Sequence, residues 1–185
     1  MKIIKDKSAK SVANWSALKV QLVNLDPASL VGLLHDLYAA SKDNQAFLHA
    51  RFDLGDDVLK PYKATLERWL SPDVFRNQDV SVSKAKKAVA DFKKAGGQPT
   101  DLAELMVLYC ERAAGFSAEV GMDDEVYLGA LVSMFGHALT TIAGLPVELR
   151  AGMFNRLESA RRIGRHLGYG VGEGMDTLWR EHGLP

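Results

Sequence analysis

The segment covering residues 99–142 decides the fold: PTDLAELMVLYCERAAGFSAEVGMDDEVYLGALVSMFGHALTTI. Its apolar residues recur at helical spacing and occupy most of the circumference of two long helices, which Gly121 separates. A helix that is apolar nearly all round would leave a large apolar face in water, so other elements must enclose both helices. The sequence therefore predicts a central helical hairpin at about residues 100–143, surrounded by the rest of the chain.

Helical periodicity also explains the segments on both sides of this hairpin. The dipeptide Asp26-Pro27 predicts a helix start, with an aspartate as N-cap and a proline in the first turn. Inside the hairpin, we expect Thr100 or Asp101 to cap the first helix and Asp123 to cap the second. No segment alternates persuasively like a strand. We predict an all-α fold, a multi-helix bundle or helical-repeat-like array of about nine helices.

Bulk composition is typical of a globular protein, with 47% hydrophobic residues and 23 basic residues against 23 acidic ones. The length of 185 residues predicts a single helical domain over residues 14–185, preceded by a mobile basic arm over residues 1–13. Cys110 is the single cysteine and lies in the most apolar run, which predicts a buried, inert thiol in a reducing compartment. We expect no signal peptide and no membrane span, and hence a cytoplasmic protein.

Charge is segregated along the chain although it sums to zero. Lysines concentrate in residues 84–94 and arginines in residues 148–165. These basic helices, at about 84–94 and 150–166, could bind nucleic acid or another anion. The lysines of this basic patch are Lys84, Lys86, Lys87, Lys93 and Lys94. The alternative is that both helices carry ordinary solvated faces, with pairs such as Lys87 with Asp91 and Glu158 with Arg162.

A sharper candidate anion site lies near the end of the arginine-rich helix. Two cationic pairs on consecutive turns could hold one anion from two sides. They are Arg161, Arg162, Arg165 and His166. The glycines that follow, at positions 168, 170, 172 and 174, lack the spacing of a phosphate loop. They predict close helix packing or a bend, with Tyr169 filling a gap.

A candidate metal or acid-base site lies on the central hairpin. Glu104 and Glu111 are seven residues apart on one stripe of the first helix, and His137 lies on the second helix. Two carboxylates and an imidazole facing each other in a bundle can hold a metal or transfer protons. The alternative is that the glutamates mark the one solvated side of a mostly buried helix.

Two segments resemble a known family. They are SKAKKAVADFKKAGGQPTDLAELMVLYCERAAGFSAEVGMDDEVYLGALVSMFGHAL, from residue 83, and LVGLLHDLYAASKDNQAFLHARF, from residue 30. Together they are similar to an uncharacterised family of small bacterial all-helical proteins, catalogued only as a domain of unknown function. The resemblance covers about residues 28–143 and implies an all-helical fold. It assigns no functional residue.

These observations favour a non-enzymatic module that binds another protein or copies of itself, and they predict no cofactor. Helices with segregated charge supply complementary faces, whereas no catalytic motif stands out. Nucleic-acid or anion binding through the basic helices is the alternative prediction. A metal-dependent enzyme using Glu104, Glu111 and His137 is a third.

Overall fold

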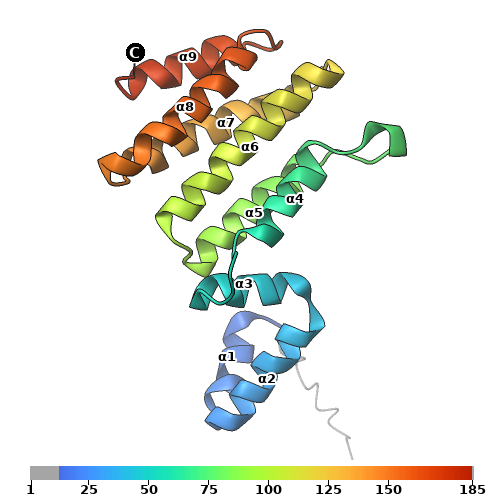
Figure 1. Cartoon of the computed structure of the whole chain (residues 1–185). Helices are drawn as coiled ribbons and strands as arrows, with labels where there is room; N and C mark the ends of the chain where they lie inside the picture. The colour runs from blue at the N-terminus through green and yellow to red at the C-terminus, as the bar shows by residue number, and fades with distance from the viewer. Residues whose placement is uncertain (1–12, 185) are drawn as a thin grey trace, which may run out of the picture. The chain divides into compact units, whose positions relative to one another are not determined.

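A computed structural model of the chain describes residues 13–184 and is helical throughout that range (Figure 1). The predicted all-α class is confirmed, with nine α-helices and one short 3₁₀ turn in the described residues. The predicted basic arm lies, except for Ala13, outside them. The elements are α1 (Trp15–Val23), α2 (Pro27–Ala40), α3 (Lys42–Phe52), α4 (Lys60–Leu70), η1 (Val74–Arg76), α5 (Val82–Ala95), α6 (Pro99–Val120), α7 (Glu125–Ala143), α8 (Val147–Gly164) and α9 (Val171–Glu181).

Contacts within the chain divide it into two compact units. We call residues 1–45 the N-terminal unit and residues 46–185 the C-terminal unit, and the boundary between them falls inside α3. This division is finer than the single domain predicted for residues 14–185. A contact pattern does not test whether the units fold separately, so the domain boundary stays a prediction.

The N-terminal unit contains α1, α2 and the start of α3. The predicted helix start at Asp26-Pro27 is confirmed, because the Asp26 carboxylate accepts hydrogen bonds from the backbone N–H groups of Ala28 (2.9 Å) and Ser29 (3.0 Å). The side-chain amide of Asn44 donates to the carbonyl of Leu37 and ties α3 back to α2. Despite these local bonds, α1 and α2 contain no buried residue.

The C-terminal unit is built around the predicted hairpin of α6 and α7. Figure 1 shows α6 passing through the middle of this unit, and α6 contacts α4, α5, α7 and α8. Gly121 ends α6 with a φ of 65°, a left-handed conformation that glycine adopts at little cost. The unit therefore encloses its most apolar helices, as the sequence predicted.

Both predicted caps of the hairpin are wrong, the first by two or three residues and the second by one. Gln98 occupies the N-cap of α6, because Pro99 lacks an N–H and suits the first helical turn, so the helix begins before Thr100. Asp124, rather than Asp123, caps α7, and its carboxylate accepts a 2.7 Å hydrogen bond from the N–H of Tyr127. Neighbouring carboxylates compete for one cap, and sequence alone does not rank them.

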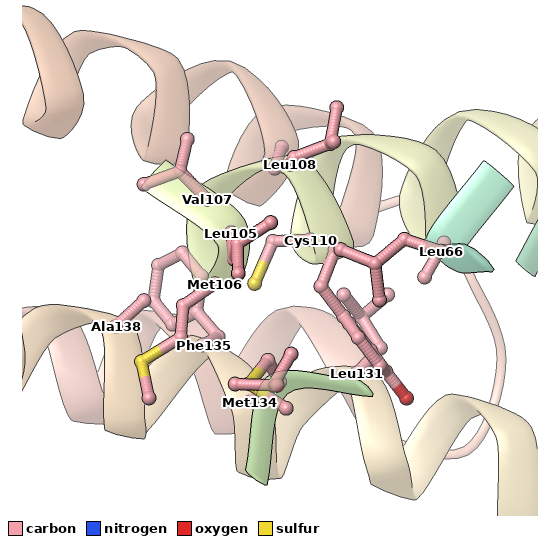
Figure 2. Close-up of a cluster of buried hydrophobic side chains, with 14 of the residues drawn as sticks. Leu66, Leu105, Met106, Val107, Leu108, Cys110, Leu131, Met134, Phe135 and Ala138 are labelled. Carbon is pink, nitrogen blue, oxygen red and sulfur yellow. The ribbon is translucent and has the colours of Figure 1, made fainter. Parts of the chain in front are cut away.

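The core lies between α6, α7 and the helices around them. Figure 2 shows Leu105, Leu131 and Phe135 within one buried cluster, and all three are fully buried. Phe135 also stacks against Trp179 of α9, with ring centroids 6.2 Å apart. Cys110 is fully buried in the same cluster, and burial raises the pKa of its thiol. The prediction of a buried, inert thiol is therefore confirmed in its burial.

Helix α7 bears on the expectation of no membrane span, which stays a prediction. Residues 126–143 contain no Asp, Glu, Lys or Arg, and α7 is long and apolar enough to cross a membrane. Half of that span is buried within the described structure. Because the core helix of a soluble protein has the same length and composition, this property is weak support for a membrane protein.

The glycines near the end of α8 allow close contact with α9. A Cβ at Gly164 would lie 2.6 Å from the sulfur of Met175, and one at Gly172 would lie 2.8 Å from the Cα of Arg165. The prediction of close packing is therefore confirmed. Tyr169 does not fill a gap, however: its side chain is 56% exposed, and its φ is 54° in the turn before α9.

Candidate functional site

The arginines of the predicted anion site are neutralised by the chain itself. Arg161 and Arg165 both bind the carboxylate of Asp176 on α9, with closest nitrogen-to-oxygen distances of 3.1 and 3.0 Å. Hydrogen bonding to Arg165 is the main reason that the pKa of Asp176 lies below its ordinary value. Arg162 pairs with Glu158 at 2.8 Å, as the sequence predicted. Arg161, Arg162 and Arg165 thus already have anionic partners.

Two further observations give the arginine cluster a structural role. Arg161 is only 8% exposed, and its guanidinium lies 4.6 Å from the centre of the Trp179 ring. His166 is exposed. The cluster joins α8 to α9 and does not converge on one open anion position.

The predicted metal triad is separated in the structure. The guanidinium of Arg156, on α8, donates to Glu104 at 2.5 Å and to Glu111 at 2.7 Å. His137 lies on α7 in a groove that faces α5. Over residues 13–184, no group of three His, Cys, Asp or Glu side chains could hold a metal ion. The glutamates point to an arginine on another helix, which sequence spacing could not reveal.

The five lysines of the basic patch on α5 have different surroundings. Lys84 lies over the ring of Trp69, with its Nζ 3.6 Å from the ring centroid, and Lys87 pairs with Asp91. Lys86 and Lys93 instead line the groove between α5 and α7. Lys94 is exposed near the end of the helix. The patch is therefore not one uniform cationic face.

An exposed apolar surface on the N-terminal unit is the feature that the sequence did not identify as a site. Nine large apolar side chains of this unit are exposed, and Trp15 is 67% exposed. We call them the apolar surface of α1–α2: Trp15, Leu18, Val20, Val23, Leu25, Val31, Leu33, Leu34 and Leu37. Most of these leucines recur at helical spacing, which is also the pattern of a covered core face. The valines beside them were the available signal, because a covered stripe does not need apolar neighbours on both flanks.

Over its described residues, 13–45, the charge of the N-terminal unit is low and mixed, and the lysine-rich residues 1–12 lie outside this description. Its described residues carry two lysines, Lys19 and Lys42, and three aspartates, Asp26, Asp36 and Asp43. A surface of this kind has no strong electrostatic preference for a polyanion or a polycation. Its binding chemistry is set by apolar contact.

No family model, curated protein or solved structure matches the chain. The resemblance to an uncharacterised bacterial helical family therefore stays a prediction.

Proposed function

We propose that this chain is a non-enzymatic assembly module that associates with a second copy of itself through the apolar surface of α1–α2. The observation that carries the proposal is that α1 and α2 bury no residue, while these helices and the turn between them expose nine large apolar side chains. Monomeric soluble proteins rarely expose contiguous apolar surface on this scale, and such surfaces mark interaction sites. The C-terminal unit, with its enclosed core, would then act as a stable scaffold.

Two properties of the N-terminal unit favour a second copy as the partner. Two helices that bury no residue of their own do not enclose a core between them, whereas two such pairs can make a four-helix bundle. A two-fold symmetric contact places the same surface on both sides, so the surface must not repel itself. The mixed charges of Lys19, Lys42 and the three aspartates meet that requirement.

Sedimentation equilibrium of the full chain tests this proposal. We expect a dimer whose dissociation constant rises at least about tenfold in Leu34→Lys, since an ammonium group would be buried in an apolar contact. Ala39→Lys is the matched control, because Ala39 is exposed on the same helix but outside the apolar surface. This control should leave the dimer intact.

The outcome that overturns the proposal is a monomer at every concentration up to about 0.5 mM, well above the affinity of a specific apolar interface. A dimer that Leu34→Lys and Ala39→Lys weaken equally also overturns it, because the contact would then lie elsewhere. Circular dichroism and urea unfolding of both variants show whether the C-terminal unit has kept its fold.

Polyanion binding through residues 84–94 and 150–166 is the second candidate. Lys86 and Lys93 support it, because no carboxylate pairs with either within residues 13–184. The pairs made by Arg161, Arg162 and Arg165 count against it. Binding of a DNA or RNA oligonucleotide that weakens steeply with salt and is lost in Lys86→Glu would favour this candidate over self-association.

A further inference from the structure

A groove in the C-terminal unit combines an apolar floor with a cationic rim. Three buried side chains form the floor: Val89 of α5, Met106 of α6 and Met134 of α7. Figure 2 shows Met106 and Met134 within the buried cluster, so the groove reaches the edge of the core. Lys86, Lys93 and His137 lie among the other lining residues. The cavity volume is about 410 Å³, which falls within the range of small-molecule sites.

The charge of this lining has one sign. No acidic side chain lines the groove among the described residues, and neither lysine is ion-paired there. By contrast, Lys87 on the same helix pairs with Asp91, and Lys84 is placed over an indole ring. The hydroxyl of Thr141 donates to the carbonyl of His137 within α7 and also lies 3.4 Å from the sulfur of Met106, so it is one polar group beside an otherwise apolar floor. The groove thus offers two uncompensated ammonium groups next to an apolar surface.

The length of the groove limits the size of the ligand that it can bind. Its lining spans Lys86 to Lys93 on α5 and Ser133 to Thr141 on α7, which correspond to about 10 to 12 Å of helix. This length is too short for a partner helix of three or four turns and suits a small molecule. A single anionic group would reach the lysines at the rim while an apolar tail covered the methionines.

We propose that the groove between α5 and α7 binds a small amphiphilic anion, with a carboxylate at Lys86 and Lys93 and an apolar tail against Val89, Met106 and Met134. This site lies wholly in the C-terminal unit and does not depend on self-association through α1–α2. Methionine adapts to different apolar shapes, so the floor would select for charge and size more than for detailed structure.

Octanoate is a suitable probe, with octanol as the uncharged molecule of the same chain length. Carbon-13 labelling of the methionine methyl groups gives a local readout in the full-length protein. We expect octanoate to shift the signals of Met106 and Met134 in a saturable manner and to leave Met153 and Met175 unchanged. Octanol should bind more weakly, because the lysines gain nothing from an uncharged head group.

Three variants separate the contributions. Replacing both Lys86 and Lys93 by Gln should weaken octanoate binding at least about fivefold, as expected for two partly exposed ion pairs, and should not change octanol binding. Lys94→Gln, on the same helix but outside the groove, is the control and should bind like the wild type. Ala90→Phe should abolish binding of both molecules, since its side chain would occupy the groove.

Several results would overturn the proposal. Equal shifts of all methionine signals would show non-specific association, and the absence of saturable shifts up to about 10 mM octanoate would exclude even millimolar binding. An unchanged affinity in the double lysine variant would mean that the rim does not recognise the anion. One-dimensional methyl spectra of each variant without ligand report whether its core has remained folded.

Discussion

The α1–α2 pair and the α6–α7 hairpin are both helical pairs with apolar residues at helical spacing, but they differ in burial. Leu105, Leu131 and Phe135 of the hairpin are fully buried, whereas Leu18 and Leu34 of the N-terminal pair are half exposed. The hairpin is enclosed by α4, α5, α8 and α9 within its own unit. Amphipathic spacing thus establishes which face of a helix is apolar, and the presence of neighbouring elements determines whether that face is buried.

The largest expected effect comes from emptying the enclosed core. Phe135→Ala should lower the free energy of unfolding by about 3 to 5 kcal/mol, because a buried aromatic leaves a cavity. Leu105→Ala and Leu131→Ala should cost about 2 to 5 kcal/mol each. Leu34→Ala, measured in dilute solution where the chain is monomeric, should cost less than about 1 kcal/mol. Urea unfolding followed by circular dichroism measures all four, and equal losses at Phe135 and Leu34 would remove the contrast between the two pairs.

Glycine substitutions should give effects of opposite sign in the two units. Gly172→Ala should destabilise by about 1 to 3 kcal/mol, since its Cβ would meet the backbone of Arg165. Gly32→Ala, on α2, places its Cβ in open space and should stabilise that helix by about 0.5 to 1 kcal/mol. Thermal unfolding of both variants provides the test. A stabilising Gly172→Ala would mean that α8 and α9 lie farther apart than the structure shows.

A smaller effect should appear on acidification. Hydrogen bonding to Arg165, with Arg161 also contributing, holds the pKa of Asp176 below its ordinary value of 3.8. A carboxylate whose pKa is lower in the folded protein stabilises it above pH 3.8, and this contribution is lost as the pH falls through the folded pKa. The contact between α8 and α9 should therefore loosen below about pH 4, as measured by Trp179 fluorescence. Asp176→Asn should reduce the pH dependence in this range, and an unchanged acid transition would contradict the assignment.

Local features of the fold could be predicted from the sequence because they depend on adjacent residues. Asp26 with Pro27 begins α2 and Gly121 ends α6, each through interactions within a few positions. The buried leucines of the hairpin were equally predictable, because few polar residues interrupt them. Val126 belongs to the same apolar series but lies in the first turn of α7 and is 75% exposed.

The candidate sites depend on contacts between distant segments, which periodicity does not contain. Asp176 lies 11 residues after Arg165 and on another helix, so the sequence showed cations without their partner. In the sequence, Lys86 and Lys93 cannot be distinguished from the other lysines of α5. They differ because they line the groove that α5 forms with α7. His137 lies on that same groove and not beside Glu104. Each of these relationships becomes visible only when the order of helix packing is known.

The bridge made by Arg156 has a consequence for the axial register of the helices. Glu104 and Glu111 lie two turns apart on α6, and both form ion pairs with the guanidinium of Arg156 on α8. Apolar contacts alone would tolerate a slide of α8 along α6, since leucine surfaces fit one another in several positions. A slide by one turn, about 5.4 Å, would take the guanidinium away from at least one carboxylate. The bridge therefore favours one axial alignment of α8 on α6, which apolar contacts alone would not determine.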